Sequence, residues 1–210
     1  MKTNITFECL SASDAESISA ATTLYLDAFK NEAVTNFAFR LDQQKGKQFM
    51  HQFTTSYLKL AIQNGDQVLV AKDDNRIVAI AIMNLPNQHQ RRSSIGDYLC
   101  LWKDALPLLA YVKYPHLNRV IPGMAVPKEL PKMMNTLQIF AVSTDVQGEG
   151  IGRQFLAELK RRFTMPDGLY LTTGIQRSAD YYQEAGFRLL ETRQYEGLSI
   201  YHLYLDEKKV

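Results

Sequence analysis

The stretch from Leu137 to Phe163 constrains the fold of this chain more than any other. It begins with an apolar run, Leu137 to Val142, whose β-branched and aromatic residues are typical of a buried strand. Three glycines follow at alternate positions, Gly148, Gly150 and Gly152. Apolar residues then recur at helical spacing, at Ile151, Phe155, Leu156 and Leu159. The sequence therefore predicts a strand, a glycine-rich loop and a helix in direct succession.

A loop of this kind is suited to bind an anion. Glycine lets the backbone turn tightly and approach a ligand, and the first N–H groups of the helix point into the same space. The helix dipole adds partial positive charge there, and Arg153 adds a cation. The dinucleotide fingerprint would require a glycine at Arg153, and a P-loop would end in Gly-Lys-Ser/Thr. Neither pattern is present, so we predict a phosphate or pyrophosphate site of another kind.

Two motifs resemble a known family. Val142, followed by Gln147-Gly148-x-Gly150-x-Gly152, is similar to the acetyl-CoA pyrophosphate loop of the GNAT superfamily of N-acetyltransferases. Downstream, an apolar strand is predicted over Leu169 to Thr173, and Tyr182 follows it, four residues before Gly186-Phe187. The segment with Tyr182 and Gly186-Phe187 resembles the tyrosine helix of that family. The resemblance implies an α/β (α+β) fold in which helices flank a central mixed, mostly antiparallel sheet of about seven strands.

The same resemblance implies a binding site for acetyl-CoA. Its cofactor-binding residues would be Phe140, Ala141, Val142, Gln147, Gly148, Glu149, Gly150, Ile151, Gly152 and Arg153. The family's general acid, which reprotonates the leaving thiolate, corresponds to Tyr182. The alternative interpretation is that Tyr182 only packs in the core. If the helix is shifted by one residue, Tyr181 takes the role of the acid. The family's asparagine at the start of this helix falls on Ile175, or on Gln176 after a one-residue slip. Of these two, Gln176 can supply an amide to the cofactor.

The implied reaction is direct attack of a primary amine, on a small molecule or a peptide, on the acetyl thioester. A backbone N–H near Val142 would stabilise the developing oxyanion. A lysine-type amine has a pKa of about 10.4, so a base or a water chain must take its proton. The strand from Leu137 to Ser143 offers no carboxylate, and Glu32, Asp145 and Glu196 are near it by topology only.

Two other functions remain open, the first of them because the strand carboxylate and the family's asparagine are missing. The first alternative is a catalytically inactive module of the same fold that binds or senses CoA. The second alternative is a different phosphate-ligand protein that uses the glycine loop for a nucleotide.

Composition and charge narrow the class of protein further. With 210 residues, of which 46% are hydrophobic, the chain can form one domain, 1–210, with a sizeable core. A net charge of +2 gives no reason to expect nucleic acid as a partner. The apolar stretch from Tyr98 to Tyr114 is too interrupted for a membrane span. The first ten residues lack the apolar core of a signal peptide, so we expect a cytoplasmic protein.

Cysteines and histidines give no metal-ligand spacing, so no metal site is predicted. Cys9 and Cys100 are interpreted as buried thiols, and His89 and His116 as surface or loop residues. GNAT enzymes often form dimers, which makes a homodimer a further expectation from the resemblance.

The remaining elements follow from local patterns. We predict a first strand over Ile5 to Leu10 and a helix capped within Ser13 to Glu16. A second helix follows Gly46, and a β-hairpin spans Gly65 to Leu85. The apolar stripe of that second helix is predicted at Phe49, Phe53, Tyr57, Leu58 and Ile62. A closing hairpin pairs the runs Arg188 to Tyr195 and Leu198 to Leu205.

An insertion of about 87–134 separates the first hairpin from the glycine strand. It is predicted to hold a polar loop, one or two helices bent at Pro107, and an irregular proline-rich connection from Pro115 to Lys132. In the GNAT layout the connection between the first two helices faces the acceptor. The resemblance therefore places Ala28 to Ala33 and Phe37 to Phe39 along the acceptor pocket.

Overall fold

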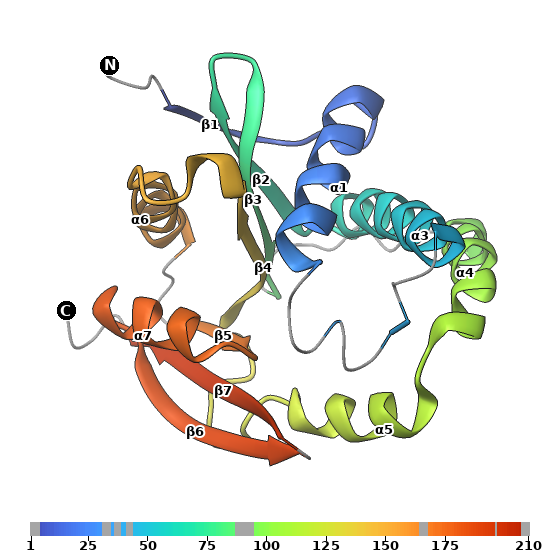
Figure 1. Cartoon of the computed structure of the whole chain (residues 1–210). Helices are drawn as coiled ribbons and strands as arrows, with labels where there is room; N and C mark the ends of the chain where they lie inside the picture. The colour runs from blue at the N-terminus through green and yellow to red at the C-terminus, as the bar shows by residue number, and fades with distance from the viewer. Residues whose placement is uncertain are drawn as a thin grey trace.

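A computed structural model describes residues 5–30, 35, 39–40, 44–86, 95–163, 168–195 and 197–206 (Figure 1). In chain order its elements are β1 Ile5–Cys9, α1 Ala15–Phe29, α3 Gln44–Gln63, β2 Gln67–Asp73, β3 Arg76–Asn84, α4 Ile95–Leu108, η1 Leu109–Tyr111, α5 Tyr114–Gly123, β4 Asn135–Val142, η2 Thr144–Val146, α6 Ile151–Phe163, β5 Leu169–Thr173, α7 Gln176–Glu184, β6 Arg188–Tyr195 and β7 Leu198–Leu205. None of the described helices is long and apolar enough to cross a bilayer.

The strands form one sheet of seven, in the order β1-β2-β3-β4-β5-β7-β6. Every neighbouring pair is antiparallel except β4 and β5, which run parallel. This arrangement confirms the mostly antiparallel, seven-stranded sheet that the sequence predicts. The parallel pair is short, because Asn135–Leu137 of β4 pairs with Leu169–Leu171 of β5 and the two strands separate beyond that point. The sheet is therefore split between β4 and β5.

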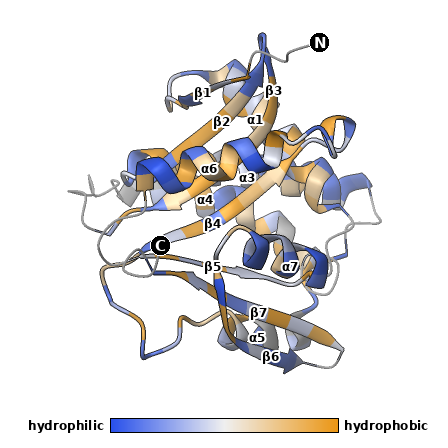
Figure 2. Ribbon diagram, turned by 90° about the vertical axis from the view of Figure 1, so that its left-hand side faces the viewer, coloured by the Kyte–Doolittle hydropathy of each residue, from blue (hydrophilic) through white to orange (hydrophobic). Residues whose placement is uncertain are grey.

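Alternating side chains of the central strands bury both faces of the sheet. Leu69 and Ala81 pack on the α6 and α7 side, whereas Val68 and Ile80 pack on the α1 and α3 side. Figure 2 shows α6 crossing β2 to β4 and α7 lying over the lower strands on the same face. The central strands in that view are predominantly hydrophobic, as expected of strands covered on both faces.

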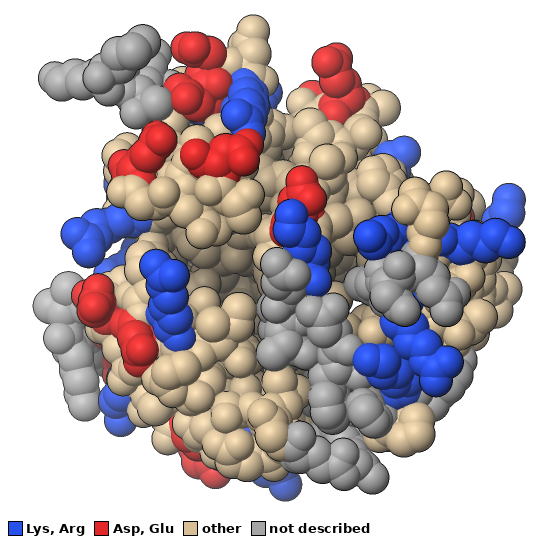
Figure 3. All heavy atoms as spheres, in the orientation of Figure 1, with Lys and Arg blue, Asp and Glu red and all other residues tan. Residues whose placement is uncertain are grey.

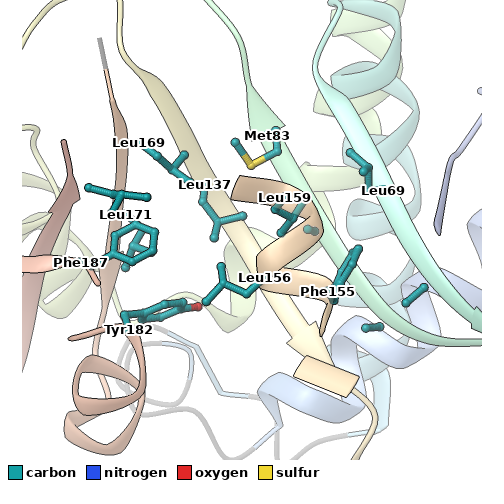
Figure 4. Close-up of a cluster of buried hydrophobic side chains, with 14 of the residues drawn as sticks. Leu69, Met83, Leu137, Phe155, Leu156, Leu159, Leu169, Leu171, Tyr182 and Phe187 are labelled. Carbon is teal, nitrogen blue, oxygen red and sulfur yellow. The ribbon is translucent and has the colours of Figure 1, made fainter. Parts of the chain in front are cut away.

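The α6 helix is anchored by the apolar stripe that the sequence predicts. Ile151, Phe155, Leu156 and Leu159 are all buried. Figure 4 shows three of these side chains, Phe155, Leu156 and Leu159, meeting residues from β4, β5 and α7. Each such side chain contributes about 1.5–3 kcal/mol to the free energy of unfolding by leaving water. This packing fixes the N-terminus of α6 at the end of β4.

The α5 helix lies against the β6–β7 hairpin on the face opposite α7. Its last residue, Gly123, packs so closely that an added Cβ would lie 2.6 Å from Cε2 of Tyr195 and 2.8 Å from Cδ1 of Ile200. The prediction of an irregular connection from Pro115 onward was wrong for this segment, because α5 spans Tyr114–Gly123. Proline is accommodated in a first helical turn, whose N–H groups need no helical partner, and Pro115 stands there.

The predicted stripe of α3 is confirmed only in part, and the predicted burial of the two cysteines was wrong. In α3 the buried side chains include Met50, Thr54 and Leu58, whereas Phe53 and Tyr57 stack on each other at 6.4 Å on a half-buried side. The helix packs between α1 and α4, with Leu58 fully buried and Tyr57 and Ile62 packed against the core, so its buried face overlaps the predicted stripe only in part. Cys9 and Cys100 are exposed, not buried. Cys9 ends the edge strand β1, and Cys100 lies on α4.

Most other elements are confirmed. The strands β5, β6 and β7 have the predicted bounds, and Asp14 caps α1 by accepting from the Ser17 N–H at 3.0 Å. The α4 helix ends one residue after Pro107, as the predicted bend requires. The predicted polar loop, with His89, lies outside the described residues.

Candidate active site

The split between β4 and β5 forms a cleft of about 850 Å³. Residues from α6 and α7 line one mouth, and residues from α1, from the end of α5 and from β7 line the other. Because α6 and α1 lie on opposite faces of the sheet, the cleft passes through the sheet. Figure 3 shows a hollow between the upper and lower parts of the molecule with mostly uncharged atoms on its visible wall.

The edge of β4 presents unpaired backbone groups to this cleft. The Ser143 N–H donates to the Val78 carbonyl of β3 at 2.8 Å. Since successive residues of a strand point their backbone groups to opposite sides, the N–H and C=O of Val142 and Phe140 face the cleft. The Gln147 side-chain amide donates to the Val142 carbonyl at 3.4 Å, which supports this assignment.

One extra residue distorts β4 where the two strands begin to separate. Leu137 pairs with Met83 and Ile139 with Ile82, so Gln138 has no partner in β3 and forms a bulge. Its side-chain oxygen accepts a hydrogen bond of 3.0 Å from the Tyr57 hydroxyl of α3. The bulge therefore fixes a polar side chain at the wall of the cleft, which Gln138 lines.

The glycine loop forms the cationic end of the cleft. Gly148 has φ +92° and Gly150 has φ +81°, conformations that favour glycine, and a Cβ at either position would meet no atom within 4 Å. The Gln154 N–H donates to the Gly150 carbonyl at 3.1 Å, so the amides before it lack partners within α6. Arg153 and Arg177 line the same mouth. Open space, free amides and two cations are the features of an anion-binding site, and this end of the cleft is the candidate for one.

Two neighbouring tyrosines of α7 line the cleft from the other side. Tyr182 is 7% exposed, and its ring meets Phe140 at 6.2 Å and Phe187 at 5.7 Å, both edge to face. Figure 4 shows this ring extending from α7 into the apolar cluster, with its oxygen on the side nearest Leu156. Burial, with a smaller contribution from Tyr181, raises the pKa of Tyr182 well above its usual 10. The hydroxyl is therefore protonated at neutral pH.

Tyr181 carries a polar atom without a partner. Its hydroxyl is buried and makes no hydrogen bond within the described ranges. It lies 3.6 Å from the position that a Cβ on Gly152 would occupy, at the start of α6. Burial raises the pKa of Tyr181 to about 12, and Arg153 partly opposes this shift. Buried polar groups in proteins are hydrogen-bonded as a rule, so we expect a ligand or a water molecule in the cleft to supply the partner of this hydroxyl.

The second mouth is lined mainly by aromatic and aliphatic side chains, together with the polar Thr35 and Gln138. Ala28 and Phe29 lie there, as predicted for the acceptor pocket, and Phe39 instead pairs with Val112 in an isolated bridge. The remaining predicted acceptor residues lie outside the described part of the chain, except Lys30, which pairs with Asp27 at 3.8 Å.

Most of the predicted site residues come together at the cleft. Those that line it are Phe140, Ala141, Val142, Gln147, Gly148, Gly150, Gly152, Arg153 and Tyr182. Glu149 and Gln176 are exposed and do not line it, and the Gln176 amide donates to Asp180 at 2.7 Å. The Ile151 side chain is buried in the core, so this residue can contribute its backbone N–H.

The carboxylates named from sequence do not supply a base at the described cleft. Asp145 forms an ion pair with Arg76 and does not line the cleft, whereas Glu32 and Glu196 lie outside the described residues. Among the described lining residues there is no carboxylate. Within the same ranges, no three His, Cys, Asp or Glu side chains are grouped as a metal site would require.

Sequence reasoning missed most of one edge of the cleft, where it had singled out Ile175 and Gln176 alone. This edge consists of the C-terminal end of β5 and the start of α7, with Thr172, Thr173, Gly174, Arg177 and Ser178. The signal was available in principle, because ligands in α/β sheets bind beyond the carboxyl ends of parallel strands. It required knowing that β4 and β5 are the parallel pair.

Comparisons with known proteins agree with this architecture. No protein-family model matches the sequence, and no curated protein matches it. A solved structure from Corynebacterium glutamicum, described as histone acetyltransferase HPA2 and related acetyltransferase, has a TM-score of 0.62 and 18% identity over 96% of both chains. A Desulfovibrio desulfuricans protein assigned to the GNAT family of acetyltransferases has a TM-score of 0.55 and 14% identity, over 96% of this chain and 98% of that chain.

A third structure was solved with a ligand. It is yncA of Salmonella typhimurium, assigned as an acetyltransferase and solved with its cofactor acetyl-CoA, with a TM-score of 0.53 and 16% identity. The match covers 98% of this chain and 95% of yncA. These similarities show that the chain has the fold of the GNAT acetyltransferases, as its two motifs predict.

Proposed function

We propose that this protein is an N-acetyltransferase that transfers the acetyl group of acetyl-CoA to a primary amine of a small molecule or peptide. One observation carries the proposal, namely the cleft that passes through the sheet between β4 and β5. The anion site lies at one mouth, and an uncharged pocket lies at the other. A thioester and an amine can thus approach the same point from opposite faces of the sheet.

The residues of the first mouth fit acetyl-CoA. The pyrophosphate would accept hydrogen bonds from the free amides at the start of α6, with Arg153 and Arg177 as counter-charges. Each charge-assisted hydrogen bond of this kind contributes roughly 1.5–3 kcal/mol. The backbone groups of Phe140 and Val142 can pair with the amides of the pantetheine arm, as a strand would. The unpaired Tyr181 hydroxyl gains a partner in the same ligand.

In the proposed reaction the amine nitrogen attacks the carbonyl carbon of the thioester. A C–N bond forms, the C–S bond breaks, the nitrogen loses a proton and the sulfur gains one, which gives an N-acetyl amine and CoA. The Val142 N–H faces the cleft and can donate to the oxyanion that develops. Tyr182, which is protonated at neutral pH, donates to the departing sulfur and recovers its proton from water.

Proton loss from the amine is assigned to water in this mechanism. No described residue that lines the cleft carries a carboxylate. We therefore expect kcat/KM to rise about tenfold per pH unit from pH 6 until the pKa of the amine is reached. A plateau beginning near pH 7 with an amine of high pKa would instead reveal a side-chain base.

A catalytically inactive CoA-binding protein is the second candidate. It is favoured by the absence of a carboxylate from the described lining and by Ile175, an exposed apolar residue at the position of the family's asparagine. Calorimetric titration with acetyl-CoA, followed by thiol release with a panel of amines, separates the two. Binding with release supports the enzyme, and binding without release on any amine supports the inactive module. Preferential binding of ATP or NAD over acetyl-CoA would contradict both the enzyme and the inactive CoA-binding protein.

A further inference from the structure

We propose that the acceptor is a monoamine carried on an apolar, uncharged body, such as an alkylamine or an arylalkylamine, and not a polyamine or an aminoglycoside. The inference rests on the proposed function, because it names the substrate class of the same cleft. It is carried by the chemistry of the second mouth and by the rigidity of one of its walls.

The described lining of the second mouth is mostly apolar and aromatic, with Thr35 and Gln138 as its uncharged polar members. Its side chains include Tyr25, Ala28, Phe29, Met124, Ile139 and Ile200. The rings of Tyr25 and Phe29 lie 4.7 Å apart and are tilted by 36°, which gives the pocket an aromatic wall. The charged side chains on the described lining are Arg153 and Arg177, and both belong to the anion mouth.

This lining selects between amines through desolvation. Because the described lining of this mouth offers no carboxylate, an ammonium group that enters it loses hydration without gaining a counter-charge from these residues, and burial shifts the amine toward its neutral form. The neutral amine is the nucleophile, and a single amine can therefore be buried and activated together. A second or third ammonium group on the same molecule must be desolvated without any such benefit. The pocket therefore discriminates against polycations.

The wall that carries Met124 is held in place by hydrogen bonds from Arg193 and His202, of which the His202 contact is buried. One Arg193 nitrogen donates to the carbonyls of Pro122, Gly123 and Ala125, at 3.2, 3.2 and 2.7 Å. His202 Nε2 donates to the Gly123 carbonyl at 2.9 Å, because a carbonyl can only accept. These contacts satisfy the carbonyls at the C-terminal end of α5. The apolar surface is thus a fixed part of the pocket.

The sharpest test compares hexylamine with 1,6-diaminohexane, which differ only by the second amine. With acetyl-CoA saturating, we expect kcat/KM for hexylamine to exceed that for the diamine at least tenfold, and phenethylamine to resemble hexylamine. In calorimetry with the CoA complex, hexylamine is expected to bind more tightly than the diamine. Equal or greater activity with the diamine overturns the inference. So does failure of both apolar amines to bind the CoA complex.

Acetyl-CoA binding is measured first and separately, so that failure of the proposed function can be distinguished from failure of the assigned acceptor class. A protein that does not bind acetyl-CoA contradicts the proposed function. A protein that binds acetyl-CoA and acetylates polyamines preferentially retains that function and contradicts only the assigned acceptor class.

A variant pair tests the assigned wall. Met124→Glu places a carboxylate at the second mouth and is expected to reduce the hexylamine-to-diamine ratio of kcat/KM about fivefold. Met133→Glu is the matched control, because Met133 is 46% exposed against 47% for Met124 and does not line the cleft. Its ratio should equal that of the unmodified protein. An unchanged ratio in Met124→Glu would show that the end of α5 does not contact the acceptor.

Discussion

Replacement of Gly150 by aspartate tests the anion site most severely. Gly150 has φ +81°, and the space where its side chain would project contains no protein atom within 4 Å. The left-handed backbone costs an L-residue roughly 1–2 kcal/mol, with or without ligand, so this strain lowers the free energy of unfolding. The new carboxylate acts on binding, because it occupies the space assigned to the pyrophosphate.

The loss of affinity can be worked out from charge alone. Two like charges at 4 Å repel by about 1 kcal/mol in water and about 4 kcal/mol at the effective dielectric constant of a protein surface. Taking about 2 kcal/mol for this exposed loop, we expect acetyl-CoA to bind about 30-fold more weakly to Gly150→Asp. Isothermal titration calorimetry at fixed ionic strength measures this change.

Two further variants separate strain from charge. Gly150→Ala carries the backbone strain without the carboxylate and should keep most of the affinity. Gly197→Asp introduces the same strain and charge in the β6–β7 turn, where φ is +87° and the space is also open, and should bind acetyl-CoA normally. Unchanged affinity in Gly150→Asp, or an equal loss in Gly197→Asp, would refute the assignment of the loop.

Three other predictions concern the tyrosines, pH and the core. Tyr182→Phe should lower kcat about 100-fold and leave acetyl-CoA affinity unchanged. Tyr181→Phe should mainly weaken acetyl-CoA binding. The reverse pattern would make Tyr181 the general acid and Tyr182 the residue that binds the cofactor. Burial lowers the pKa of His202 below its usual 6.5, so the folded state binds fewer protons than the unfolded state. Stability should therefore fall as pH drops below about 6.5, and urea denaturation of His202→Gln should lose part of that dependence. Phe155→Ala, at a fully buried site, should lower the free energy of unfolding by about 3–5 kcal/mol, and a loss under 1 kcal/mol would contradict its place in the core.

The C-terminal half of the fold could be predicted from sequence because its signals are local. The apolar runs Leu169–Thr173 and Leu198–Leu205 are strands with the expected bounds. Gly197, in the turn between β6 and β7, has the positive φ that a tight connection favours. The glycines before α6 likewise marked the anion site, since positive φ and free amides are properties of the loop itself.

The second mouth could be predicted only in part, because three remote segments form it and only the α1 segment, with Ala28 and Phe29, was expected there. Phe29 from α1, Met124 after α5 and Ile200 from β7 meet only once the order of the strands is known. The helix α5 was itself missed, since prolines at its two ends suggested an irregular chain. Its position depends on the hydrogen bonds that Arg193 and His202 donate to its C-terminal end, which no sequence spacing indicates.

The central claim is tested most directly by mixing the protein with acetyl-CoA and hexylamine and following free thiol and N-acetylhexylamine together. The account predicts that the two products appear in equal amounts, only when protein and amine are both present, and more slowly with Tyr182→Phe. Tight binding of acetyl-CoA without either product, across hexylamine, phenethylamine and 1,6-diaminohexane, would contradict the assignment of catalysis to this cleft.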